Sequence, residues 1–235
     1  MANLKIINPN GTFLVVLPHT GSNIPKNLEH LLLNEEQKND YDLGSYEVFN
    51  QLVDLNASVI YSDIHRYIVD LNRKRNEAIH EKDFDGNKLH IQKNNQKELI
   101  LSNYYDQFHD HINNKIIELN NNENDTLLLY GHTYNVIGKK NTPDFNTKRP
   151  HFCLGTLDDT SANINYINKF ENSLVRLTKK YSFSFSKNFP YKGKSFYLNR
   201  GNSIQSLQLE VREDICQTKT DLVKYIISES VKELL

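Results

Sequence analysis

Two histidines occupy similar places in the sequence, each at the end of a short apolar stretch. His19 follows FLVVLP and lies in PHTG, and His132 follows LLLYG and lies in GHT. A glycine beside each of them allows the backbone to approach other segments closely. Neutral imidazole is the commonest zinc ligand, and a catalytic zinc site uses three protein ligands, often including a carboxylate, with one position open. The pair therefore predicts part of a metal site, although either histidine taken alone is more often an ordinary loop or core residue.

A second polar group ends the segment that begins at Arg66 and runs through YIVDLNR. Asn72 supplies amide donors, and Arg73 supplies a rigid guanidinium fork that suits bidentate capture of a carboxylate better than a lysine does. Arg66 lies close enough in sequence to join them. The alternative is a solvated helix start whose arginines form surface salt bridges.

An acidic residue, Glu210, interrupts the apolar positions of LQLEVRE. Because side chains alternate across a strand, Glu210 shares one face with Gln208 and Arg212, while the apolar residues of this segment lie on the other. Beside a metal ion, such a glutamate can deprotonate water and pass the proton to a leaving nitrogen. The alternative is a structural glutamate paired with Arg212.

Three further features carry weaker predictions. His109 shares a helical face with Tyr105 and could point toward a pocket, although a packing role is more usual for such a histidine. The stretch 76–92 is typical of an exposed excursion that could cover a site. The loop 187–193 contains proline and glycine and could border the same site.

Elements that alternate between strand and helix must position these residues. The apolar runs predict strands over 13–17, 57–64, 125–133, 149–156 and 205–213, and the helical periodicities predict helices over 42–55, 94–119, 161–180 and 219–235. This order predicts one α/β domain over residues 1–235, with a mostly parallel or mixed central sheet flanked by helices. In such sheets ligands bind beyond the carboxyl ends of the strands, where both histidines fall.

The composition narrows the range of partners. The 235 residues include 28 Lys and Arg against 29 Asp and Glu, so the formal net charge of -1 argues against nucleic-acid or anionic-lipid binding by overall charge. No apolar run approaches the roughly 20 residues of a membrane span, and the first residues do not read as a signal peptide. Cys153 and Cys216 are too few and too far apart for a disulfide framework. We therefore expect a cytoplasmic protein with a small-molecule substrate, and the sequence leaves its oligomeric state open.

The motifs PHTGSNIP, DLG, HRYIVDLNR, YGHTY, RPHFCLGT, NFPYKG and LQLEVRED follow one another in this order along almost the whole chain. Together they resemble the N-formylglutamate amidohydrolase family, which is related to zinc carboxypeptidases and aspartoacylase. The resemblance implies a phosphorylase/hydrolase-like α/β fold, one zinc ion and hydrolysis of the amide bond of an N-acyl amino acid.

The resemblance also implies roles for individual residues. His19 and His132 would be zinc ligands, and Glu210 would be the general base and acid. The substrate carboxylate would be bound by Arg66, Asn72 and Arg73. Zinc carboxypeptidases place a glutamate three residues after the first histidine, whereas this chain has Ser22 there. The carboxylate ligand must then come from elsewhere, and Asp42 of the DLG motif is the candidate.

These features predict a zinc-dependent amidohydrolase that cleaves a small N-acyl acidic amino acid, such as N-formylglutamate. One alternative is a catalytically inert member that binds a carboxylate. Another is a peptide-directed, carboxypeptidase-like enzyme with the same metal site. The sequence leaves the acyl group open.

Overall fold

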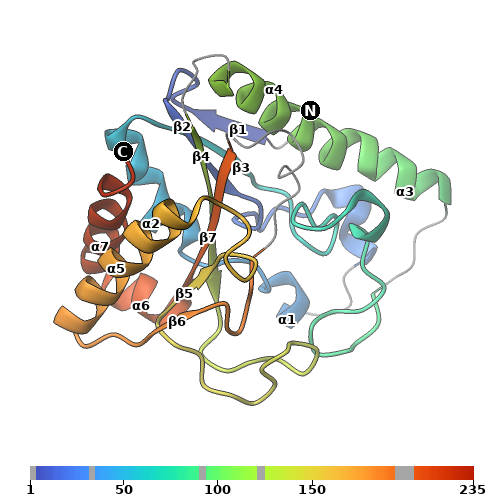
Figure 1. Ribbon diagram of the computed structural model, residues 1–235. Coiled ribbons are helices and arrows are strands. Elements are labelled where there is room, and N and C mark those ends of the chain that lie inside the picture. The colour runs from blue at the N-terminus through green and yellow to red at the C-terminus, as the bar shows by residue number, and fades with distance from the viewer. Residues whose placement is uncertain (1–3, 32–34, 90–93, 121–124, 194–203) are drawn as a thin grey trace.

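A mixed β-sheet forms the centre of the molecule (Figure 1). The computed structural model describes residues 4–31, 35–89, 94–120, 125–193 and 204–235. Within them the sheet has seven strands in the order β1-β3-β2-β4-β7-β5-β6. The strands are β1 (Leu4–Ile7), β2 (Phe13–Leu17), β3 (Ala57–Ser62), β4 (Thr126–Tyr134), β5 (Phe152–Gly155), β6 (Phe185–Lys187) and β7 (Ile204–Arg212).

The four central strands, β3, β2, β4 and β7, run parallel to one another. At the edges, β1 pairs antiparallel with β3, β5 pairs antiparallel with β7, and β6 runs parallel to β5. The carboxyl ends of the central strands therefore meet at one edge of the sheet. This topology confirms the predicted α/β class and its mostly parallel sheet.

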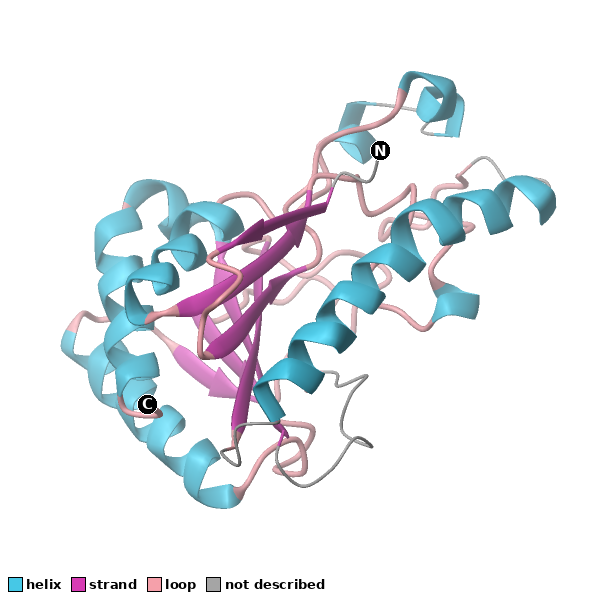
Figure 2. Ribbon diagram, turned by 90° about the horizontal axis from the view of Figure 1, so that it is seen from above, coloured by secondary structure: helices cyan, strands magenta, loops and turns pink. Residues whose placement is uncertain are grey.

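Helices cover both faces of the sheet (Figures 1 and 2). One face carries α2 (Ser45–Phe49), the 3-10 helix η2 (Asn50–Leu55), α5 (Ile164–Lys180), α6 (Glu213–Thr218) and α7 (Thr220–Lys232). The other carries α3 (Asn94–Ile100), the π-helical segment η4 (Leu101–Asp106) and α4 (Gln107–Asn120). Short helices η1 (Lys26–Leu31), α1 (Glu35–Lys38) and η3 (Arg75–Glu77) lie in the connections.

The alternation along β2 explains why its sequence is apolar throughout. Phe13, Val15 and Leu17 pack into the core on the side of α2, α5 and α7, whereas Leu14 and Val16 pack into the core beneath α4. A strand buried on both faces requires an unbroken apolar run. The same burial applies to every residue of β4 and β7, including the polar ones near their carboxyl ends.

Several boundaries differ from the sequence-based expectation. The helix predicted over 42–55 begins only at Ser45 and tightens into a 3-10 helix after Phe49. The helix predicted over 94–119 contains the π-helical segment. The helix predicted over 219–235 corresponds to α7, whereas the short helix α6 that precedes it was not predicted. The short strands β1 and β6 were not expected, because edge strands of three or four residues leave little periodic pattern.

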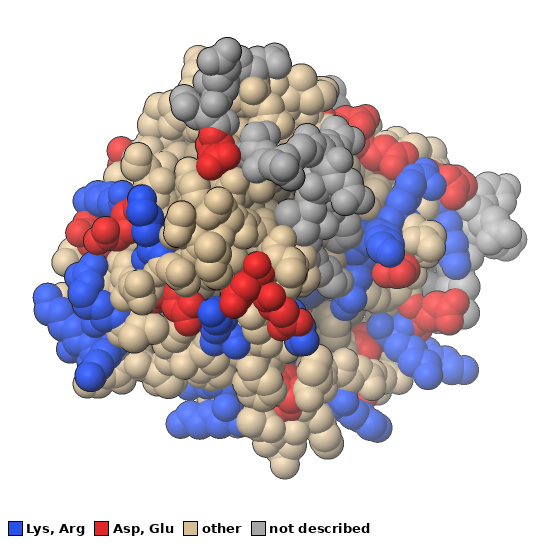
Figure 3. Space-filling model, viewed as in Figure 1, with Lys and Arg blue, Asp and Glu red and all other residues tan. Residues whose placement is uncertain are grey.

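The surface charges, the described helices and the two cysteines agree with the expectations drawn from the composition. Acidic and basic side chains lie close to one another on the face viewed in Figure 3. None of the described helices is both long enough and apolar enough to cross a membrane. Cys153 and Cys216 are buried free thiols. The cytoplasmic location stays a prediction from the sequence.

Candidate active site

The carboxyl ends of three neighbouring strands bring the predicted residues into one pocket of about 530 Å³. His19 follows β2, His132 lies near the end of β4, and Glu210 on β7 is the direct register partner of His132. A Cβ at Gly131 would lie 2.6 Å from a methyl carbon of Leu17 and 2.8 Å from ring carbons of Phe49, so any larger residue beside His132 would displace these core side chains. The sheet register therefore places a base next to an imidazole without any contribution from flexible loops.

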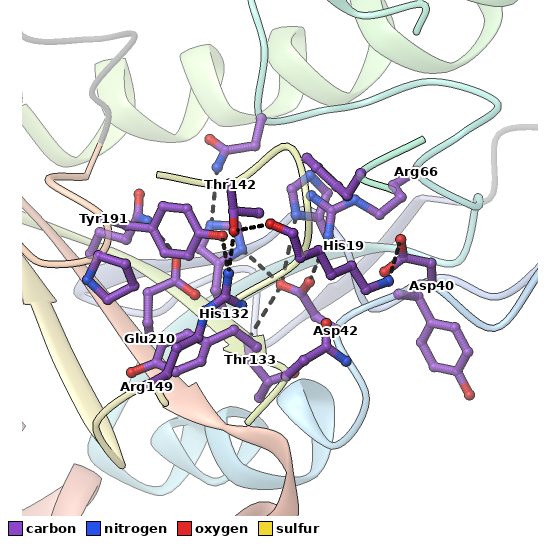
Figure 4. A pocket seen from close by; sticks show the side chains of 18 of the residues that line it. His19, Asp40, Asp42, Arg66, His132, Thr133, Thr142, Arg149, Tyr191 and Glu210 are labelled. Atoms are coloured by element: carbon purple, nitrogen blue, oxygen red, sulfur yellow. Dashed lines mark hydrogen bonds and ion pairs between the residues drawn. The ribbon is translucent and has the colours of Figure 1, made fainter. Parts of the chain in front are cut away.

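Asp42 lies between the two histidines and completes a group of three candidate metal ligands (Figure 4). Its Oδ2 atom lies 2.8 Å from Nδ1 of His132 and 3.7 Å from Nδ1 of His19. One ligand atom from each residue lies within 4.8 Å of the other two, and all three residues are buried. The structure thus brings together His19, Asp42 and His132, as the prediction required.

The donor chemistry of this group fits a divalent ion such as zinc. Nε2 of His19 lies 2.7 Å from Oδ1 of Asp70 and must donate its proton, because a carboxylate only accepts. In the neutral form of His19, Nδ1 then carries the lone pair. This nitrogen is buried and makes no hydrogen bond to any described residue. A buried imidazole nitrogen that faces a carboxylate and a second imidazole is suited to bind a cation.

Asp42 is held in place by its backbone as well as by its charge. Its N–H donates to the carbonyl of His19 at 2.9 Å, and its own carbonyl accepts from the hydroxyl of Ser45 at 2.7 Å. Burial acts to raise the pKa of Asp42, but the charge of His19 and the hydrogen bond from His132 outweigh it and hold that pKa well below its usual range. Asp42 is therefore ionised, as a metal ligand must be.

Asp70 is a central residue of the site that the sequence did not single out for a role. Beyond His19, its carboxylate accepts from the backbone N–H of Asn72 at 2.9 Å and contacts Nε2 of His80 at 2.8 Å. Burial would raise the pKa of Asp70, but the charge and hydrogen bond of His19, and the hydrogen bond of His80, hold it well below the usual range. A carboxylate that orients a ligating imidazole is a common partner in metal sites.

Glu210 is buried and retains a proton more easily than an ordinary glutamate. Burial raises its pKa from 4.5 to about 7, with His132 lowering it and Asp42 raising it. Its Oε1 accepts from Nε2 of Gln208 at 2.7 Å. Arg212 instead binds Asp214, at 2.7 Å and 3.0 Å. The alternative that paired Glu210 with Arg212 is therefore not what the structure shows.

The three residues predicted to hold a carboxylate occupy different positions. The side chain of Arg73 is 34% exposed, lines the pocket and lies 3.4 Å from Asp70 through its Nε. Asn72 lies with Nδ2 3.2 Å from Nε2 of His132. Arg66 forms an ion pair with Oδ1 of Asp42 at 3.1 Å. Arg73 is thus the most accessible of the three, and Arg66 and Asn72 also support the metal group.

Arg149 is a pocket residue to which sequence reasoning gave no role. Its guanidinium forms two hydrogen bonds to Asp144, at 2.7 Å and 3.0 Å, and donates to the hydroxyl of Tyr191 at 2.9 Å. It also lies over the ring of Tyr134, 5.2 Å from its centroid. The only sequence signal is its place as the first residue of the strand predicted over 149–156, in RPHFCLGT.

The three weaker predictions have different outcomes. The loop 187–193 contributes Pro190 and Tyr191 to the pocket wall, and the 76–92 excursion contributes Phe84, while 90–92 lie outside the described residues. His109 does not line the pocket, and its ring stacks on Tyr105 with centroids 4.1 Å apart. The packing interpretation of His109 is therefore the one that the structure supports.

Known proteins show a consistent similarity. The family model for N-formylglutamate amidohydrolase matches residues 11–216. The fold is similar to the crystal structure of N-formylglutamate amidohydrolase from Ralstonia eutropha JMP134, with a TM-score of 0.81, 15% identity, and coverage of 100% of this chain and 98% of that chain. It is also similar to a gene product from Agrobacterium tumefaciens, with a TM-score of 0.79, 16% identity, and coverage of 100% and 95%. No curated protein matches the sequence significantly.

The matched region includes the candidate metal group, the candidate base and Arg73, the partly exposed arginine of the pocket. It extends over residues 11–216 and so covers most of the 235 residues. The chain belongs to the N-formylglutamate amidohydrolase family.

Proposed function

We propose that the protein is a metal-dependent amidohydrolase that cleaves the amide bond of a small N-acyl acidic amino acid, with N-formylglutamate as its first candidate substrate. Family membership supports the amide chemistry. The observation that carries the metal dependence is the buried group of His19, Asp42 and His132 beside Glu210 in one pocket.

His19, Asp42 and His132 would hold one divalent ion, for which zinc suits two imidazoles and a carboxylate. When bound, the ion supplies Lewis acidity that polarises the scissile carbonyl and makes water a better nucleophile at neutral pH. Asp70 and Arg66 contribute by orienting two of these ligands. Asp70 contacts Nε2 of His19, and Arg66 contacts Oδ1 of Asp42, which leaves Nδ1 of His19 and Oδ2 of Asp42 for the ion.

Glu210 performs the proton transfers. Its carboxylate accepts a proton from the attacking water and then donates it to the leaving nitrogen, so that the amide and water become a carboxylic acid and an amine. A general base works best when its pKa lies near the working pH, and burial brings the pKa of Glu210 to about 7. Gln208 holds one carboxylate oxygen, which leaves the other for the proton.

Arg73 provides the cation for the substrate α-carboxylate. Its planar guanidinium matches two carboxylate oxygens, and its exposed fraction of 34% leaves it accessible from the pocket. Asn72 precedes Arg73 on the same loop and contacts His132, so the residues that would bind the carboxylate lie directly beside the metal group.

The direct test is a substrate panel on the zinc-loaded protein. N-formyl-, N-acetyl- and N-succinyl-glutamate are incubated with the enzyme, and released amine is measured. We expect hydrolysis of at least one of them, lost in His19→Ala and kept in His30→Ala, which removes an exposed histidine of η1. Glutamate binding without turnover of any compound would favour the inert alternative. Cleavage of peptides alone would favour the peptide-directed one.

A further inference from the structure

The long helical region over 94–120 widens into a π-helix at η4, which contacts the loop that carries Arg73. Within this segment Tyr105 is buried, and its hydroxyl donates to the backbone carbonyl of Arg73 at 2.7 Å. The hydrogen bond joins residues 32 positions apart in sequence. π-Helical turns are rare and are often found at functional sites.

A second contact secures the same loop from outside. Asp106, the next residue of η4, binds the guanidinium of Arg75 at 2.8 Å and 3.0 Å, and Glu98 of α3 binds it at 3.0 Å. The helical region therefore holds the loop at Arg73 and again at Arg75. Because Tyr105 and Asp106 are adjacent, one segment makes both contacts.

The ring of Tyr105 is itself fixed by its neighbours. It stacks on His109, one turn later, with centroids 4.1 Å apart, and belongs to the core that also contains Phe108 and Ile112. A rigid aromatic ring places its hydroxyl with little freedom, so the position of the Arg73 carbonyl follows from the packing of the helix.

The side chain of Arg73 has little else to orient it. Among the described residues its only ion pair is the contact of 3.4 Å with Asp70, and its side chain is one-third exposed. The direction in which its guanidinium points therefore depends on where its backbone is held. That backbone is held by the bond from Tyr105 and by its own N–H, which lies 3.3 Å from the carbonyl of Asp70.

We propose that Tyr105 is a positioning residue for substrate binding, which acts through the Arg73 backbone to aim the guanidinium at the substrate α-carboxylate. The proposal rests on the proposed function in one respect, namely that Arg73 binds this carboxylate. It adds a residue outside the pocket lining, and it gives the π-helical segment a role in substrate recognition.

The experiment compares Tyr105→Phe with Tyr104→Phe, its neighbour in η4, using N-formylglutamate and the matched compound whose α-carboxylate is replaced by a primary amide. Tyr105→Phe removes one partly buried hydrogen bond, so we expect KM for N-formylglutamate to rise about two- to tenfold, with kcat changed less than twofold. KM for the amide compound should stay unchanged, and Tyr104→Phe should resemble the wild type. In an Arg73→Ala background, Tyr105→Phe should have no further effect.

Three outcomes would overturn the proposal. An unchanged KM, an equal rise for both compounds, or the same rise in the Arg73→Ala background would reduce Tyr105 to a structural residue while leaving amide hydrolysis intact. If the wild type turns over no N-acyl amino acid, the proposed function fails, and the same comparison is made on the Kd of L-glutamate by calorimetry. Absence of glutamate binding would then overturn both proposals.

A second variant guards against loss of folding in Tyr105→Phe. Asp106→Asn changes a partly exposed position of the same segment and weakens the contact with Arg75, while the hydroxyl of Tyr105 is kept. A smaller rise in the same KM, of about twofold, is expected, since exposed ion pairs contribute little. If Tyr105→Phe does not fold and Asp106→Asn leaves KM unchanged, the proposal fails.

Discussion

Replacing Glu210 by Gln should make the protein more stable and less active at once. The carboxyl group of Glu210 is buried, and its pKa rises from 4.5 to about 7 on folding because burial disfavours the charge. For a group with a raised folded-state pKa, stability is present in full below the unfolded value and is lost as the pH rises through the folded one. Glutamine is neutral at every pH and accepts the same hydrogen bond from Gln208, so the variant does not lose this stability.

The magnitude follows from the two pKa values. The difference between 4.5 and about 7 corresponds to about 3 kcal/mol when the carboxyl is fully charged in both states. We therefore expect Glu210→Gln to exceed the wild type in free energy of unfolding by about 3 kcal/mol at pH 8 and by about 1 kcal/mol at pH 5. Urea unfolding followed by circular dichroism measures both values, with chelator present so that no cation stabilises the charge.

The same variant should lose most of its turnover. General acid–base catalysis contributes about 100- to 10,000-fold, so kcat of zinc-loaded Glu210→Gln should fall by at least the lower figure. Glu233→Gln, which neutralises an exposed carboxylate at the end of α7, is the matched control and should change neither property. A Glu210→Gln variant that is less stable than the wild type at pH 8 and retains more than a tenth of its kcat would refute the reasoning.

Three further variants probe the residues around the metal group. Asp70→Asn should weaken zinc binding about 10- to 100-fold in a competition titration, because the amide no longer fixes the tautomer of His19; unchanged affinity would remove Asp70 from this role. Arg73→Lys keeps the charge but loses the planar guanidinium with its two parallel donors, so kcat/KM should fall roughly ten- to a hundredfold. Wild-type kinetics would show that Arg73 does not bind the carboxylate. Arg149→Ala strips the partner from buried Asp144 and should destabilise the fold by about 3–5 kcal/mol in urea unfolding; a loss below about 1 kcal/mol would mean that the pair is not structurally important.

The sequence predicted the residues at strand ends well because strand geometry is regular. The alternation in LQLEVRE placed Glu210 on a polar face, and the register of β7 with β4 then sets it opposite His132. Asp42 was a candidate only through the resemblance to the family, since it precedes α2 and reaches the site through a backbone contact with His19 that no periodicity encodes.

Residues whose role depends on long-range contacts could not be assigned in this way. Asp70 contacts His19 across 51 positions in sequence, and Arg149 reaches Tyr191 across 42. The π-helical turn that orients Tyr105 also escaped prediction, because its apolar spacing is compatible with an ordinary α-helix. Tertiary packing determines these two contacts and the π-helical turn, and the periodicity of a single sequence does not reveal that packing.

Titration of the metal-free enzyme with zinc tests the central claim most directly. Chelator-treated protein is loaded stepwise, and bound zinc and hydrolysis of N-formylglutamate are measured on the same samples. The account predicts that activity rises in proportion to bound zinc and levels off at one ion per chain, and that His19→Ala, Asp42→Ala and His132→Ala each lose that ion. Full activity without metal, or one tightly bound zinc ion retained in all three variants, would contradict it.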